Sequence, residues 1–334
     1  MTHTTILVAV LAAAALASEP PVKLPTAWEM SPPLIAPVER PDDPYVSVKD
    51  PTFAYHEGRW HVFMSIRAVG HTPIEYASFE AWDKANAAPR TVLTLREKYF
   101  CAPQVFYFRP HKKWYLVHQV GEPTRRLKHQ PAFATTTDIA DPKSWTKSQL
   151  FFPKDDPPSR KVAGLDYWII CDEERAYLFY TSLNGNLWRM WTRIEDFPYG
   201  LDHFELALRA DIFEASHIYK LKGVDKYLAV IEAGQSGRRY FKAYLADRLD
   251  GKWKALADSE KKPFAGRADV RAAPGETLWA DNISHGELIR DSYDERLIAD
   301  PANLRFIFQG VLQKNKPREY GKIPWRIGML TPAK

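Results

Sequence analysis

Alternating apolar and polar positions divide the chain into pairs of short strands joined by polar turns. One pair joins residues 213–219 to 227–233 through a turn that contains Gly223, which is the pattern of a β-hairpin. The same layout recurs at residues 50–55 with 60–64, 103–108 with 114–117, and 166–170 with 176–180. Helical periodicity is almost absent after residue 45, so the pattern predicts an all-β fold.

A polar residue stands near the head of each unit, and these heads recur roughly every fifty residues, as in the blades of a propeller. The heads are Asp50, Gln104, Asp166, Glu214 and His285. The last unit begins at residues 281–290, and residues 304–310 and 325–330 supply its later strands. We therefore predict a five-bladed β-propeller over residues 45–334. A two-sheet sandwich is the competing architecture, but it does not explain why polar residues head the repeats.

The first 44 residues do not show this strand pattern. Residues 1–17 hold an apolar run too short to span a bilayer, and Ala15-Leu16-Ala17 resembles a cleavage site, which predicts a signal peptide and a secreted protein. The start lacks Lys and Arg, so an apolar N-terminal helix is the alternative. Residues 18–44 are rich in proline and predict an extended linker lying along the domain surface. No later apolar run is long enough to predict a membrane span.

Composition excludes some partners. The net charge of +5 over 334 residues is small, and the basic residues are scattered, so we expect no nucleic-acid partner. The basic cluster at residues 125–129 is better explained as a solvated loop than as an anion site. Cys101 and Cys171 lie in or beside strands, and two buried thiols or a disulfide are both open.

A propeller fold would bring three acids that are distant in sequence together in one site. Inner strands of a propeller converge on its axis, so Asp50, Asp166 and Glu214 should be neighbours in space. Like charges and desolvation raise carboxyl pKa values in such a place. Two carboxyl groups divided into an acid and a base are the machinery of glycoside hydrolysis. Taken alone, Asp50 before Pro51 could instead be a simple turn.

Short motifs in one order carry a resemblance to a known family. Among them are Lys49-Asp50-Pro51-Thr52, Phe213-Glu214-Ala215 and Ile283-Ser284-His285-Gly286. The others lie at residues 102–108, 165–172, 178–180, 232–233, 237–241, 263–266, 287–290, 308–310 and 323–331. Together they resemble the α-L-arabinofuranosidases of glycoside hydrolase family 62, and they cover nearly all of the chain after the proline-rich segment.

The resemblance implies a five-bladed propeller that removes arabinofuranosyl side chains from arabinoxylan or arabinan with inversion. It implies Asp50 as general base, Glu214 as general acid, and Asp166 as the residue that fixes the sugar and tunes the pKa of the acid. Lys49, Gln119, Arg239 and Tyr320 match substrate-binding positions. A central calcium ion is implied beside His285, with waters and Gln104 as further ligands. The expected partner is an arabinose-decorated polysaccharide or oligosaccharide, and we expect a monomer.

The chain also departs from the family pattern. Val120-Gly121 stands where many members place a tryptophan platform for the polymer backbone, and a basic loop follows at residues 122–129. This favours the hypothesis that shorter or acid-decorated fragments are substrates, with Arg125 and Arg126 as the cationic side chains. Two other functions stay open: a related propeller glycosidase, such as a β-xylosidase or an arabinanase, and a non-catalytic carbohydrate-binding propeller.

Overall fold

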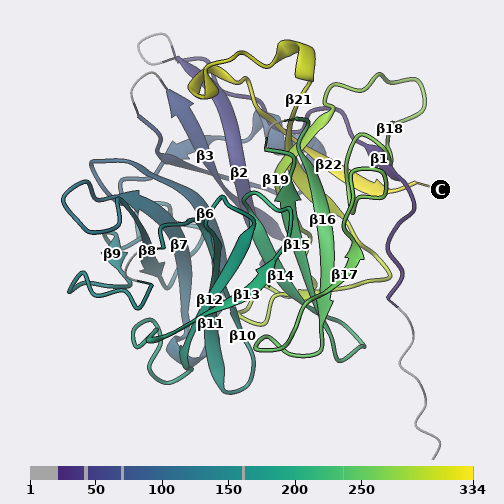
Figure 1. The fold of residues 1–334 in the computed structure, drawn as a ribbon. Coiled ribbons are helices and arrows are strands. Elements are labelled where there is room, and N and C mark those ends of the chain that lie inside the picture. Colours follow the sequence, from purple (N-terminus) through teal and green to yellow (C-terminus); the bar gives the residue numbers. More distant parts are fainter. Residues whose placement is uncertain (1–21, 41–43, 69–70, 160–161, 236, 334) are drawn as a thin grey trace, which may run out of the picture.

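Five β-sheets make up the fold, and they are the five blades of a β-propeller (Figure 1). The computed structural model describes residues 22–40, 44–68, 71–159, 162–235 and 237–333. The expected signal peptide lies outside these residues. The all-β, five-bladed prediction is confirmed, and the four expected hairpins are the pairs β2/β3, β6/β7, β10/β11 and β14/β15.

The first three blades follow the chain as four-stranded antiparallel sheets. Blade I contains β2 (Tyr45–His56), β3 (Arg59–Ala68), β4 (Ile74–Phe79) and β5 (Arg90–Val92). Blade II contains β6 (Phe100–Phe108), β7 (Lys113–Gly121), β8 (His129–Thr136) and β9 (Gln149–Leu150). Blade III contains β10 (Leu165–Cys171), β11 (Arg175–Thr181), β12 (Asn186–Arg193) and β13 (His203–Arg209).

The last two blades recruit strands from elsewhere in the chain. Blade IV contains β14 (Ser216–Leu221), β15 (Tyr227–Ala233), β16 (Tyr240–Ala246), β17 (Lys254–Ala257) and the parallel strand β20 (Ile298–Ala299). Blade V contains β19 (Asn282–Leu288), β21 (Phe306–Val311), β22 (Arg326–Pro332), β1 (Trp28–Met30) and β18 (Val270–Ala272). The described helices are short 3-10 turns: η1 (Trp82–Ala87), η2 (Arg109–His111), η3 (Gln313–Asn315) and η4 (Tyr320–Lys322).

Strand β1 changes the interpretation of the proline-rich segment. It pairs antiparallel with β22 near the C-terminus and parallel with β18, so this part of the segment is a strand of blade V rather than a linker. Trp28 is completely buried, and its Nε1 donates to the carbonyl of Phe264 at 2.6 Å. No proline interrupts residues 26–31, which leaves their N–H groups free to join a ladder. The propeller therefore begins before residue 45, and β1 ties both ends of the chain into one sheet.

Aromatic and aliphatic side chains fill the spaces between the blades. The largest of the fully buried side chains include Trp168, Tyr177, Phe179 and Phe241. Cys101 and Cys171 are both buried and free, so the structure corresponds to the two-thiol alternative. Within the described residues, no helix is long and apolar enough to cross a membrane.

Candidate active site

Four of the five inner strands carry a β-bulge where the expected site residues lie. The pairing register shifts between Lys49 and Thr52 in β2, and between Leu165 and Trp168 in β10. Equivalent shifts occur in β6 and β19. At these bulges Asp50 and Asp166 have positive φ values of 50° and 56°, which aspartate tolerates better than most residues. A bulge re-aims side chains away from the regular alternation of a strand, so it can turn them toward the propeller centre.

Hydrogen bonds tie each bulge to a neighbouring blade. The carboxylate of Asp166 accepts from the Ala215 N–H at 3.0 Å, which joins blade III to blade IV. Three further contacts do the same for other blades: Asp50 N–H to Gln309 Oε1 at 2.7 Å, Ala102 N–H to Ser65 Oγ at 2.8 Å, and His285 N–H to Glu232 Oε2 at 2.8 Å. These bonds fix the positions of the acids relative to one another.

Asp50 lies between two basic side chains and is 4% exposed. Lys49 Nζ lies 2.9 Å from Asp50 Oδ2, and His285 Nδ1 lies 3.4 Å from Oδ1. Burial favours a higher pKa, but Lys49 and His285 outweigh it and hold the pKa of Asp50 below its usual value. Asp50 is therefore ionised at neutral pH, as a general base must be.

Asp166 stands between the other two acids. Its Oδ2 lies 3.8 Å from His285 Nδ1, so one imidazole faces both Asp50 and Asp166. Burial raises the pKa of Asp166, and the nearby Asp50 charge adds to this, against the opposing effects of His285 and the Ala215 N–H. The bond to Ala215 places Asp166 directly beside the segment that carries Glu214.

Glu214 shares one arginine with a second, deeper glutamate. Arg239 Nη1 lies 3.1 Å from Glu214 Oε1 and 2.6 Å from Glu232 Oε1, and Glu232 is completely buried. Burial raises the pKa of Glu214 well above its usual value, and the charges of Glu232 and Asp166 raise it further despite Arg239. Glu214 is therefore suited to carry a proton at neutral pH.

The expected substrate-binding residues divide into two groups. Lys49 and Arg239 contact the acids directly, and Tyr320 is half-exposed with Lys49 Nζ 5.8 Å from the centre of its ring. Lys49 and Tyr320 also line one cavity, together with Tyr99. Gln119 is buried one step behind this cavity, where its Nε2 donates to Tyr99 Oη at 3.0 Å. Gln119 thus reaches the cavity through Tyr99.

The residues expected to hold calcium do not form an oxygen-rich set. Gln104 Oε1 accepts from the Ile169 N–H, and Gln104 Nε2 donates to the Ile169 carbonyl, both at 2.7 Å. These bonds give Gln104 the role of joining blades II and III. Across the described ranges, no group of three or more His, Cys, Asp or Glu side chains is arranged to hold a metal. Calcium prefers six to eight oxygen ligands, so these residues do not fit the ion, and we derive no chemical step through it.

Sequence reasoning missed three residues that organise the site. The Glu232 carboxylate accepts hydrogen bonds from Arg239, the Ser284 hydroxyl and the His285 N–H. The side chain of Gln309 accepts one from the Asp50 N–H. Tyr99 lines the cavity beside Lys49 and accepts from Cys101 Sγ at 2.8 Å. A charged residue inside the apolar run 227–233 was the available signal for Glu232.

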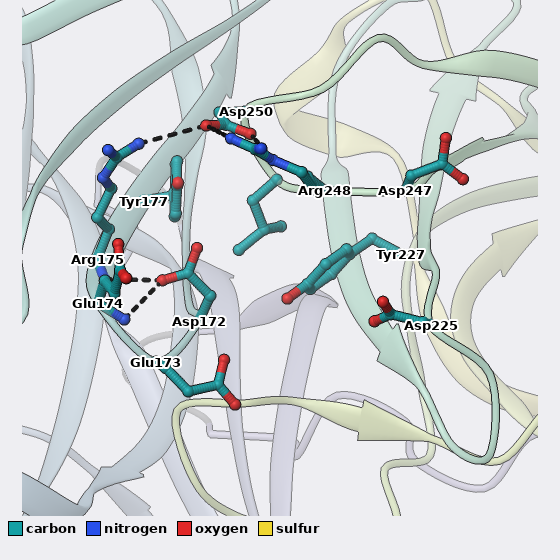
Figure 2. A pocket seen from close by; sticks show the side chains of 11 residues that line it. Asp172, Glu173, Glu174, Arg175, Tyr177, Asp225, Tyr227, Asp247, Arg248 and Asp250 are labelled. Carbon is teal, nitrogen blue, oxygen red and sulfur yellow. Dashed lines mark hydrogen bonds and ion pairs between the residues drawn. The ribbon is translucent and has the colours of Figure 1, made fainter.

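A second acid-rich pocket lies at the other ends of the inner strands (Figure 2). It is bordered by the β10–β11 and β14–β15 turns, whereas Asp166 and Glu214 lie where those hairpins begin. Its acids already have partners: Asp172 accepts from the Glu174 and Arg175 N–H groups, and Asp250 binds Arg248. These contacts stabilise turns and leave no convergent acid–base pair in this pocket.

The fold and the converging carboxyl groups define the class of the five-bladed β-propeller glycoside hydrolases. Comparison with known proteins gives the family. The chain belongs to glycosyl hydrolase family 62, whose family model matches residues 34–331. A curated relative, α-L-arabinofuranosidase C of Cellvibrio japonicus, is 36% identical over 317 residues, which cover 92% of this chain and 47% of the relative. The chain thus spans about half the length of that relative.

Solved structures agree with this assignment. The catalytic domain of the Coprinopsis cinerea family 62 α-L-arabinofuranosidase has a TM-score of 0.85 at 36% identity, covering 92% of this chain and 97% of that chain. The Podospora anserina α-L-arabinofuranosidase in complex with cellotriose has a TM-score of 0.83 at 35% identity, with coverage of 93% and 98%. A thermostable family 43 glycoside hydrolase, at 14% identity and a TM-score of 0.55, shares the fold.

Proposed function

We propose that the protein is an inverting α-L-arabinofuranosidase that releases arabinofuranosyl side chains from arabinoxylan, arabinan or fragments of them. One observation carries the proposal: Asp50 and Glu214 meet around one centre with pKa values displaced in opposite directions. An ionised base and a protonated acid that coexist at neutral pH are what glycoside hydrolysis by inversion requires. The activity in the names of the family 62 relatives supports the same sugar.

The proposed reaction uses residues of this chain alone. Glu214 donates its proton to the glycosidic oxygen as the bond from that oxygen to the anomeric carbon breaks. Asp50 takes a proton from a water molecule, whose oxygen bonds to the opposite face of the anomeric carbon. Asp166 accepts from the Ala215 N–H, which positions the neighbouring Glu214. Lys49 and His285 keep Asp50 ionised until it takes that proton.

The polymer backbone would lie across the mouth of this pocket. Structures of family 62 relatives in complex with xylotriose and with cellotriose support a β-linked oligosaccharide as the part of the substrate outside the furanose pocket. Tyr320, half-exposed beside Lys49, is the aromatic ring available to stack on such a sugar. We further propose that the protein is secreted and acts as a monomer.

Product analysis tests the proposal. The protein is incubated with arabinoxylan, debranched arabinan, a β-xyloside and p-nitrophenyl α-L-arabinofuranoside, and NMR follows the released sugar and its first-formed anomer. We expect arabinose with inverted configuration from arabinoxylan and from the aryl arabinofuranoside. Asp50→Ala should release none from either substrate, and Glu214→Ala none from arabinoxylan. Asp225→Asn, in the pocket of Figure 2, is the matched control and should keep wild-type activity.

Each of the other outcomes separates an alternative. Xylose from the β-xyloside would identify a xylosidase, and arabino-oligosaccharides from debranched arabinan would identify an arabinanase. Binding of arabinoxylan without any released sugar would identify a carbohydrate-binding propeller. Any of these three results in place of arabinose release would overturn the proposed function.

A further inference from the structure

A groove between blades I and II leads away from the cavity beside Lys49, the residue that binds Asp50. The cavity that holds Lys49 and Tyr320 shares the lining residues Arg67, Thr72 and Tyr99 with a second cavity. The second cavity continues along residues 92–100. The two cavities therefore adjoin at Arg67, and a chain of sugar units that leaves the cavity beside Lys49 on this side must pass the Arg67 guanidinium.

Arg67 is held in place by a hydrogen bond and has no ion pair among the described residues. Its Nη1 donates to Thr72 Oγ1 at 2.7 Å. Its guanidinium packs beside Gly321: a Cβ added to that glycine would lie 3.2 Å from Nη2. Within the described part of the chain, no carboxylate forms a salt bridge with it. The other arginines near buried acids are paired: Arg239 with Glu232, Arg290 with Glu287, and Arg90 with Glu75. Donor groups of Arg67 are thus available to a ligand.

The rest of the groove is predominantly basic. Lys98 and Lys147 are exposed in its lining, and Lys147 Nζ donates to the Thr94 carbonyl at 2.7 Å. Arg96 is paired with Glu122. Glu97 is the acidic side chain of this lining, and it forms no salt bridge with any described residue. Positive charge along a groove favours an anionic ligand.

The basic loop expected from the sequence is built differently. Arg125 Nη1 and Nη2 donate to the carbonyls of Phe152 and Pro153, at 2.8 and 3.0 Å. Its guanidinium therefore holds the loop in place. Arg67, in contrast, lines the cavity that contains Lys49, whose ammonium group binds Asp50.

We propose that this groove is a subsite for a carboxylate-bearing sugar, a uronosyl substituent on the backbone close to the arabinosylated unit, and that Arg67 is its specificity-determining residue. The planar fork of an arginine suits a carboxylate because two N–H groups can bind its two oxygens. Tyr99 and Tyr320 line the same cavity and can contact the sugar that carries the acid. The proposal rests on the proposed function, since it names the substrate class of the same site.

The test compares two fragments that differ in one charge. Initial rates of arabinose release are measured on an arabinoxylo-oligosaccharide and on the same oligosaccharide carrying one glucuronosyl unit, for wild type, Arg67→Gln, Arg67→Lys and Arg59→Gln. Arg59 lies on the same strand β3 at its far end, paired with Glu80, and is the matched control. We expect wild type to show a lower KM on the acidic fragment, and Arg67→Gln to raise that KM about tenfold while leaving the neutral fragment within about twofold. Arg67→Lys should retain part of the preference.

The salt dependence of this preference is a second measurement, and a variant that is merely less stable would not change it. The preference of wild type for the acidic fragment should fall as sodium chloride is raised, because screening weakens the contact. Equal KM values on both fragments for wild type, or an acidic preference that survives in Arg67→Gln, would overturn the subsite while arabinose release still supported the proposed function. No arabinose from either fragment would instead overturn the proposed function itself.

Discussion

Replacing Glu232 by glutamine should move the pH dependence of catalysis without removing the catalytic acid. Glu232 and Glu214 are both bound to Arg239 Nη1, at 2.6 and 3.1 Å. Their nearest oxygens are therefore no more than about 6 Å apart, and two such charges repel by about 3 kcal/mol at an effective dielectric constant of about 20. This repulsion is one cause of the raised pKa of Glu214.

The sign of the expected change follows from these contacts. A neutral glutamine at position 232 removes the repulsion between the two carboxylates. Glu214 is then the only one of the two that still presents a carboxylate to Arg239. Both effects lower the pKa of Glu214. The acid then loses its proton at lower pH, so the alkaline limb of the profile of kcat/KM against pH moves toward acid. We expect kcat/KM at about pH 8 to fall about 30-fold, and at about pH 5 by less than about threefold.

The assay is the rate of arabinose release from an arabinoxylo-oligosaccharide, whose leaving group needs protonation, across the pH range, with thermal unfolding measured on the same samples. Glu205→Gln is the control, because Glu205 pairs with Arg189 on the outer part of blade III. A loss that is uniform at every pH would show that Glu232 only supports packing. An alkaline limb that stays in place, or moves toward higher pH, would refute the electrostatic reasoning.

Three further predictions address the base, the acid and the closure of the propeller. Burial raises the pKa of Asp50 and the charge of Lys49 lowers it, so Lys49→Met should raise that pKa. The acidic limb of the same pH profile should then move to higher pH, and an unmoved limb would contradict this. Glu214→Gln should lower kcat on arabinoxylan by about 10²-fold to 10⁴-fold, with less effect on an aryl arabinofuranoside whose leaving group needs little protonation; equal losses on both would argue against its role as acid. Trp28→Ala should destabilise the fold by about 4 kcal/mol, seen by calorimetry as a fall in Tm of about 6 °C, whereas Trp28→Phe should lose less; an unchanged Tm would show that β1 does not close blade V.

Local pattern was enough to identify the blades and the three acids. Alternation of apolar and polar residues marks a strand directly, and a turn beside it marks a hairpin. For this reason the hairpins at Asp50, Asp166 and Glu214 were predicted from the residues alone. Strand β1 was missed because three residues in a proline-rich segment carry too little periodicity to reveal a partner such as Leu330, which pairs with Met30.

Side-chain partners could not be read in the same way. The sequence does not show that the Gln104 side chain hydrogen-bonds to the backbone of Ile169 in another blade. It also does not show that Glu232 and Glu214 bind the same arginine, Arg239. The opposite pKa displacements of Asp50 and Glu214 also depend on burial and on charges brought in from distant positions.

The sequence by itself determined the main hairpins, how many blades they make and which acids head them, since these depend on neighbours along the chain. Only the tertiary structure decided that β1 joins blade V, that the pKa of Asp50 is lowered while that of Glu214 is raised, and that Arg67 has no salt bridge among the described residues. Those properties arise from strand pairing and electrostatic interactions between groups that are far apart in sequence and that the folded chain places together.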